Sequence, residues 1–217
     1  LSCIPDIVVS DVMMPIMNGI TMCKMLKEDV RTSHIPIILL TAKDSLQDKE
    51  EGYQVGADSY LTKPFSATLL HSRINNLLES RKRLAERLNT NTPHHNMDEK
   101  RALLADSLNK LDNEFLEKIN RLIEDRLSSE KIDIGYLADN MCMSKSTLYR
   151  KMKALTGLST NEYVRKIKMQ YAERLLLEGR YNVSEIAFRV GINSVVYFRQ
   201  CFKEEFGVLP SDYLKQP

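Results

Sequence analysis

The sequence predicts an α/β layer with a parallel sheet, followed by an all-α region that contains two helix-turn-helix units. Strand-like and helix-like segments alternate over the first 66 residues, whereas no strand candidate occurs after Ile132. The helical part also repeats itself at an interval of about 49 to 50 residues. Alternation of this kind is typical of parallel strands with helical crossovers, and a repeat indicates duplicated units.

Three short apolar runs are the expected strands: Asp6–Asp11, Ile35–Thr41 and Ser59–Thr62. They are rich in β-branched residues and too short for core helices. Residues between them have helical spacing, over Gly19–Lys27 and over Ser45–Gly56. Right-handed crossovers then make the strands parallel, and such sheets place ligands beyond the carboxyl ends of their strands.

Asp11, Thr41 and Lys63 all lie at those carboxyl ends. Their surroundings read PDIVVSDVMMPIMNG from Pro5, LLTA from Leu39 and GADSYLTKPF from Gly56. Thr41 follows Asp11 by 30 residues and Lys63 follows it by 52. With these three motifs at these spacings, the region resembles a response-regulator receiver domain, which has a flavodoxin-like fold.

The resemblance implies that Asp11 accepts a phosphoryl group, since a carboxylate can form an acyl phosphate. Lys63 and Thr41 then supply an ammonium and a hydroxyl to the phosphoryl oxygens, because such chemistry depends on positioning and charge. Tyr60 resembles the aromatic switch residue of the family, whose side-chain rotamer changes together with that of the residue at the Thr41 position. The family also implies a cis peptide bond between Lys63 and Pro64.

One departure concerns Mg²⁺, the cofactor that the resemblance implies. Receiver domains hold it with an acidic pair some 40 residues before the phosphoacceptor, and only ten residues precede Asp11 here. The Asp11 carboxylate and the Met13 carbonyl would leave a partial site, and Mg²⁺ prefers near-octahedral oxygen coordination. We therefore expect a partial receiver without its first two strands, inefficient phosphorylation and a sheet that is not covered as usual.

The middle of the chain connects the two regions. Residues 67–88 have the apolar stripe of one long helix, and residues 98–129 have another. Polar residues 89–96 between them indicate a linker. Leucines at 70, 77, 84 and 88 suit either a short coiled coil in a homodimer or packing back on the sheet, and the sequence leaves both open. The domains are then 1–88, which we call the receiver-like region, a connecting segment at 89–131, and 132–217.

The repeat in the last domain consists of two short helix pairs. Ile134–Met141 and Ser144–Thr156 form the first pair, and Ser184–Val190 and Ser194–Phe206 form the second. Each second helix begins at a Ser cap and ends at a Gly, as helix ends commonly do. We align Leu137 with Ile186 and Tyr149-Arg150 with Phe198-Arg199. Residues 161–178 form a helix that separates the pairs.

Residues 132–217 resemble the double helix-turn-helix domain of AraC-family transcription regulators. That resemblance implies double-stranded DNA as a partner, with the second helix of each pair in the major groove. Arg and Gln pair bidentately with guanine and adenine, so Arg150 and Gln200 are the best base readers, while the lysines suit phosphates. The residues that we expect to contact DNA are Lys145, Ser146, Tyr149, Arg150, Lys151, Lys153, Asn193, Val196, Arg199, Gln200 and Lys203.

Charge supports this arrangement, because residues 1–66 carry three more acidic than basic side chains and residues 131–217 carry five more basic ones. The leading hypothesis is a phosphorylation-controlled transcription regulator of the hybrid two-component type. Its partners would be a histidine kinase, which such regulators can carry in the same chain, and RNA polymerase. The alternative is a DNA-binding module that ignores phosphorylation and uses its receiver part only to dimerise.

An enzyme is not supported, since the sequence has no nucleophile-base constellation beyond the receiver's own phosphotransfer. The longest apolar run, Ile35–Leu40, is far below the roughly 18 residues of a membrane helix. Four scattered cysteines without zinc spacing favour a reducing cytosol. We expect a cytoplasmic location, with tethering to the inner membrane where a longer parent chain provides it.

Overall fold

The computed structural model describes residues 4–42, 54–89, 108–128 and 132–213. By its contacts the chain divides into two compact units that interleave in sequence. The first unit comprises Leu1–Asn89, Asp98–Phe115 and Arg150–Gly157, and the second comprises Thr90–Met97, Leu116–Tyr149 and Leu158–Pro217. Each unit is described by itself.

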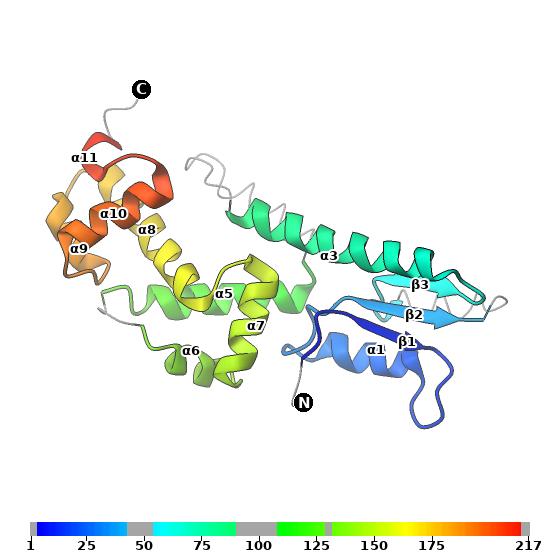
Figure 1. Cartoon of the computed structure of the whole chain (residues 1–217). Helices are drawn as coiled ribbons and strands as arrows, with labels where there is room; N and C mark the ends of the chain where they lie inside the picture. The colour runs from blue at the N-terminus through cyan, green and yellow to red at the C-terminus, as the bar shows by residue number, and fades with distance from the viewer. Residues whose placement is uncertain (1–3, 43–53, 90–107, 129–131, 214–217) are drawn as a thin grey trace. The chain divides into compact units, whose positions relative to one another are not determined.

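The first unit contains a parallel sheet of three strands in the order β1-β2-β3 (Figure 1). These strands are β1 (Val8–Asp11), β2 (Ile37–Thr41) and β3 (Ser59–Thr62). Asp11 lies beside Leu40 in the register, and Thr41 lies beside Thr62. The carboxyl ends of all three strands therefore meet at one edge, and the predicted α/β layer is confirmed.

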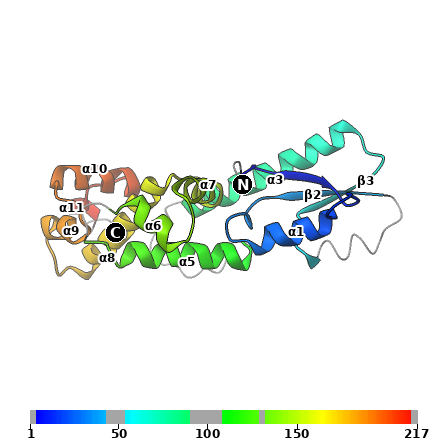
Figure 2. The same cartoon turned by 90° about the horizontal axis from the view of Figure 1, so that it is seen from below.

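Two helices, α1 (Gly19–Glu28) and α3 (Ala67–Asn89), lie on opposite faces of this sheet (Figures 1 and 2). The face toward α1 is an apolar core in which Ile20 and Cys23 pack with Ile37 and Leu39 of β2. β1 is an edge strand, and its Val9 is 38% exposed.

The α1 helix begins where it does because the Asn18 side chain accepts a hydrogen bond from the backbone N–H of Thr21 at 2.7 Å. Its first residue, Gly19, lies against the backbone of the first strand. A Cβ atom there would stand 2.3 Å from the carbonyl oxygen of Asp11 and 3.1 Å from the Cα of Val12. Only glycine lets the helix approach the phosphoacceptor candidate so closely.

The helix expected over 98–129 is shorter in the described residues, where α5 spans Lys110–Glu124. Its start is fixed by Asn109, whose side-chain oxygen accepts the backbone N–H of Asp112 at 2.8 Å. The earlier part of the expected helix lies outside the described residues, as does nearly all of the helix expected over 45–56.

The C-terminal part is helical throughout its described residues, as predicted. Among them, none of the helices is long and apolar enough to cross a membrane. In chain order the helices are α6 (Ile134–Asn140), α7 (Lys145–Thr156), α8 (Thr160–Glu178), α9 (Val183–Arg189), α10 (Val195–Phe206) and α11 (Pro210–Tyr213). We call α6 with α7 the first head, and α9 with α10 the second head.

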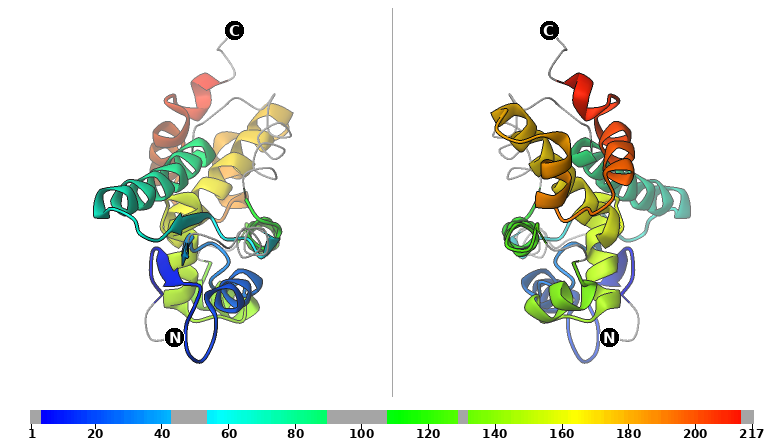
Figure 3. Two further views of the ribbon diagram at one scale, coloured as in Figure 1. Left: turned by 90° about the vertical axis from the view of Figure 1, so that its right-hand side faces the viewer. Right: turned by 90° about the vertical axis from the view of Figure 1, so that its left-hand side faces the viewer.

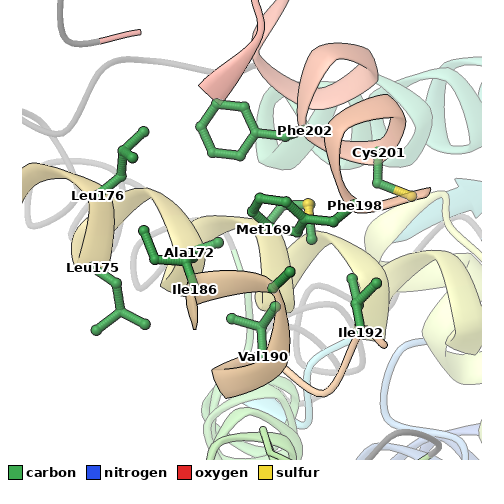
Figure 4. Close-up of a cluster of buried hydrophobic side chains, with 11 residues drawn as sticks. Met169, Ala172, Leu175, Leu176, Ile186, Val190, Ile192, Phe198, Cys201 and Phe202 are labelled. Atoms are coloured by element: carbon green, nitrogen blue, oxygen red, sulfur yellow. The ribbon is translucent and has the colours of Figure 1, made fainter. Parts of the chain in front are cut away.

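The second head packs on α8 around one apolar cluster (Figures 3 and 4). Phe198 and Phe202 of α10 are at most 1% exposed, and their ring centroids lie 5.9 Å apart. Figure 4 shows them gathered with Met169 and Ala172 of α8. The aromatic stripe is therefore core, as its helical spacing predicts.

The two heads follow one pattern with a single extra residue in the second turn. In the turns, the N–H of Met143 donates to Ala138, and that of Ile192 donates to Ala187, an offset of 49. After the turns the offset is 50, since the Ser144 and Ser194 side chains both accept the N–H three residues on.

The expected alignment of Tyr149 with Phe198 is therefore wrong by one residue. Tyr149 is 49% exposed, whereas Phe198 is 1% exposed, so the two cannot occupy the same position of the unit. Buried Leu148 matches Phe198 instead, which pairs Tyr149 with Arg199 and Arg150 with Gln200.

Backbone strain distinguishes the two turns. Cys142 has φ +53°, and the matching residue of the second head is Gly191 at φ +65°. A side chain in this left-handed region costs roughly 1 to 2 kcal/mol.

We expect Cys142→Gly to raise the free energy of unfolding by about 1 kcal/mol, because it relieves this strain and removes only an exposed side chain. Urea unfolding followed by circular dichroism measures the change. Gly191→Ala is the reciprocal variant and should lower stability. A less stable Cys142→Gly protein contradicts the account.

Gly19→Ala tests the close approach of α1 to Asp11. Alanine normally stabilises a helix relative to glycine, by about 0.5 to 1 kcal/mol. Here the clash with backbone reverses the sign, and we expect a loss of about 1 to 3 kcal/mol in urea unfolding. Thr21→Ala, at an exposed position of the same helix, is the control and should be nearly neutral. A stabilised Gly19→Ala protein contradicts the geometry.

Candidate phosphoacceptor site and nucleic-acid interface

An ion pair marks the carboxyl edge of the sheet. Lys63 Nζ lies 2.5 Å from Asp11 Oδ2, although the two residues are 52 positions apart. The side chains are 36% exposed for Asp11 and 45% for Lys63, so both reach solvent. Lys63, together with the backbone N–H groups of Met13 and Val12, lowers the pKa of Asp11 below its usual range. The structure thus holds an accessible, ionised carboxylate beside a cation.

Thr41 and Tyr60 belong to the neighbouring strands. Thr41 ends β2 with its side chain buried, and its carbonyl oxygen accepts the backbone N–H of Lys63 at 2.8 Å. That hydrogen bond places Lys63 directly beyond the sheet edge. Tyr60 is half-buried on β3. The peptide bond from Lys63 to Pro64 is cis, as the resemblance implied.

The donor set fits Mg²⁺ poorly. No group of three or more His, Cys, Asp or Glu side chains able to hold a metal occurs within the described ranges. Asp11 is the carboxylate at the edge, and its Oδ2 is engaged by Lys63. With Asp11 and the Met13 carbonyl as its expected protein ligands, a cation that prefers six oxygen ligands would depend on water for most of its coordination.

The first head exposes a polar face on α7. Among the residues expected on DNA, Lys145, Ser146, Tyr149, Arg150 and Lys153 are all exposed. The opposite face holds Leu148, Met152 and Leu155 at no more than 2% exposure. The side chain of Lys153 also donates to the carbonyl of Gly157 at 2.6 Å, which caps the end of the helix.

The second head presents the matching face of α10. Asn193, Val196, Arg199, Gln200 and Lys203 are exposed, and Val196 is 78% exposed despite being apolar. Gln200 donates to the Glu204 side chain at 3.1 Å, and so one of its donors is engaged within the helix. Both α7 and α10 therefore combine a buried face with an outward face of hydrogen-bonding and cationic groups.

The expectation for Lys151 is wrong. Its side chain is 0% exposed, and its Nζ lies 2.5 Å from Asp112 Oδ1 of α5. Burial lowers the pKa of Lys151, and the Asp112 carboxylate opposes that shift. The side chain cannot reach a phosphate, because the helix turns this position inward between Leu148 and Met152.

Sequence patterns also missed two lysines of α8 that support the second head. Lys166 and Lys168 are buried, although charged residues are almost never fully buried without a partner. Lys166 pairs with Glu205 at 3.7 Å, and Lys168 donates to the carbonyl of Gly191 at 3.4 Å. They tie α8 to the turn and to α10. Two positions apart, these lysines lie on different sides of α8, so no apolar stripe in the sequence indicates this role.

Comparison with known domains assigns the two regions. Residues 3–75 match the response regulator receiver domain, and residues 137–216 match a helix-turn-helix domain. The chain is 37% identical over 210 residues to Histidine kinase P4 of Formosa agariphila, covering 97% of this chain and 15% of that protein. The Heme response regulator HssR of Staphylococcus saprophyticus is 50% identical over 74 residues, which cover 34% of this chain and 32% of the regulator.

Among solved structures, the C-terminal domain of AraT, a response regulator from Geobacillus stearothermophilus, is similar at 30% identity. The match covers 46% of this chain and 84% of that domain, with a TM-score of 0.43. The chain thus spans only a small part of the histidine kinase and about a third of the heme response regulator. It joins a region that matches the response regulator receiver domain to a region that matches a helix-turn-helix domain.

Proposed function

We propose that this chain is the output end of a two-component phosphorelay. Its two heads bind a specific DNA sequence, and phosphorylation of Asp11 controls that binding. The observation that carries the proposal is the duplicated head, in which α7 and α10 turn matching outward faces to solvent on buried supports. Two reading helices of this kind suit two stretches of major groove.

The individual contacts follow from side-chain chemistry. Arg150 reads guanine, Gln200 reads adenine, and the exposed Val196 contacts a thymine methyl group. Exposed cations position the phosphates and contribute affinity without sequence preference. With Lys151 removed from the set, these phosphate contacts are Lys145, Lys153, Arg199 and Lys203.

The Asp11–Lys63 pair supports control by phosphorylation. An acyl phosphate on Asp11 would place new phosphoryl oxygens beside the Lys63 ammonium, which is already at hydrogen-bond distance. A partly exposed ion pair contributes little to stability, so Lys63 can change partners at small cost. Thr41 ends the neighbouring strand and would supply a hydroxyl to the same group.

The relatives support a histidine kinase as the source of the phosphoryl group. A protein named as a histidine kinase contains a segment similar to almost all of this chain. A kinase within the same polypeptide would raise the effective concentration of donor and acceptor. RNA polymerase as a partner, a homodimer through α3 and a cytoplasmic location belong to the same proposal.

Substitution of the base readers tests the DNA contacts. On a site selected from random DNA by the wild-type chain, Arg150→Ala should cost about 1 to 3 kcal/mol and relax discrimination at one base pair. Lys203→Ala is the control for a phosphate contact. It should weaken binding to all DNA sequences alike, and it should reduce the slope of log K against log salt concentration by about 1.

Fluorescence anisotropy titrations over a panel of single-base variants separate the two patterns. Uniform loss for Arg150→Ala would assign that side chain to the backbone instead of a base.

Phosphorylation is tested by intact mass after incubation with Mg²⁺ and a small acyl phosphate donor. We expect this chain to gain well under one phosphoryl group, because Asp11 and the Met13 carbonyl alone would hold Mg²⁺ weakly. A chain extended upstream to include the acidic pair of a full receiver should gain one group, and its Asp11→Asn variant none. Stoichiometric phosphorylation of the shorter chain contradicts the expected weakness.

The same extended chain separates control by phosphorylation from the alternative. DNA affinity that differs with and without the donor supports the proposal. Equal affinities, with dimerisation that depends on the receiver-like region, support the phosphorylation-independent module.

A further inference from the structure

Three polar side chains form a buried cluster inside the first unit. Lys151 Nζ lies 2.5 Å from Asp112 Oδ1 and 2.9 Å from Ser33 Oγ. Ser33 Oγ in turn donates to the same Asp112 oxygen at 2.7 Å. All three residues are 0% exposed. The cluster joins α7, the start of α5 and the loop before β2.

Stability alone does not explain these charges. Taking two charges out of water costs several kcal/mol per ion, and an apolar pair of similar volume is often as stable. The pairing here is also incomplete, because Asp112 Oδ2 has no hydrogen-bond partner among the described residues. Lys151 Nζ also lies over the face of Phe115, 4.9 Å from the ring centroid.

The second head shows that this fold does not require a cation at the position. With the offset of 50 residues, Lys151 corresponds to Cys201, which is 2% exposed in the apolar cluster. A small apolar side chain therefore fills the same place in α10. What distinguishes the first head is its partner in the receiver-like region, Ser33.

The loop that carries Ser33 is itself built of buried residues. Thr32, Ser33, His34 and Ile35 are each at most 5% exposed. A second contact from the start of α5 holds it, since Asn109 Nδ2 donates to the carbonyl of Ser33 at 3.0 Å. The loop leads directly into β2, which ends at Thr41 beside the phosphoacceptor edge.

The outward side of the same helix segment faces the receiver-like region too. Arg150 and Lys153 line a pocket together with Asp6, His34 and Arg81. A helix that reads DNA must enter a major groove about 12 Å wide, and its outward side must then be free of other protein segments. Arg150 and Lys153 are exposed, but they share this pocket with residues of the receiver-like region.

We propose that Lys151 and Asp112 form an intramolecular docking site for the loop of residues 32–36, and that this docking holds the first reading helix off DNA. Lys151 is a positioning residue in this scheme and touches no nucleic acid. The second half of the proposal rests on the proposed DNA-binding function, whereas the docking itself does not.

Hydrogen exchange measured by mass spectrometry on the whole chain tests the docking. Lys151→Met removes the charge but keeps an apolar side chain of similar length, as Cys201 shows the fold accepts. Ser33→Ala removes only the hydroxyl on the receiver side. Both should speed exchange of the amides of residues 32–35 by about tenfold, while the β2 amides stay protected. Lys118→Met, which removes an exposed charge from α5, is the control and should change nothing.

Unchanged amide exchange of residues 32–35 in both variants overturns the docking. Circular dichroism with urea unfolding verifies that the variants are folded. If Lys151→Met does not fold, Ser33→Ala alone decides the test.

DNA affinity provides the second readout. Both variants should bind the selected DNA site about tenfold more tightly than the wild-type chain, because the reading helix is released. Equal or weaker binding with faster loop exchange overturns the claim that docking opposes DNA binding. If neither the wild-type chain nor any variant binds DNA, the proposed function fails while the exchange result still decides the docking.

Discussion

A buried charge needs a partner, and this constraint shapes the first unit around Lys151. Its ammonium and the Asp112 carboxylate lie 2.5 Å apart with both side chains out of reach of solvent. Removing one partner of such a pair typically costs about 3 to 5 kcal/mol, because the other charge remains buried. The start of α5, the inner side of α7 and the loop at Ser33 therefore have to meet at one point.

The ion pair at the other end of β2 has the opposite character. Asp11 and Lys63 are partly exposed, so their attraction is screened and contributes little to folding. This weakness would let Lys63 change partners in the phosphoryl transfer that we propose at Asp11. Ser33 lies four residues before the start of β2, and Thr41 lies at its end. Strand β2 thus runs from the buried Lys151–Asp112 pair to the partly exposed Asp11–Lys63 pair. Under the proposed docking, a change at Asp11 would act on the reading helix through this strand.

Local patterns in the sequence were sufficient for most of the fold. The three strands, the long helix α3 and the Ser caps of α7 and α10 follow from apolar periodicity and from residues that accept backbone N–H groups. The site edge was predictable as well, because parallel strands align their carboxyl ends and bring Lys63 to Asp11. What these patterns share is that each depends on neighbours within a few residues or on one topological rule.

The errors arose where a tertiary partner decides the outcome. Lys151 is among the cations that the sequence predicts on DNA phosphates, but its partner Asp112 lies 39 residues away and no sequence signal links the two. The apolar periodicity predicts a helix from residue 98, whereas the start of α5 depends on the cap provided by the Asn109 side chain. The expected alignment of the heads is wrong by one residue because Asn193 lengthens the second turn. The burial of Leu148 and Phe198 identifies the correct alignment.

The central claim is that both heads read DNA together. Hydroxyl-radical footprinting tests it most directly, with the wild-type chain at a concentration that saturates its selected site and so overcomes the roughly tenfold cost of docking. Two protected patches on one face of the duplex, about one helical turn or 10 base pairs apart, are the predicted result. A single protected patch, unchanged by substitutions in the other head, would contradict the account.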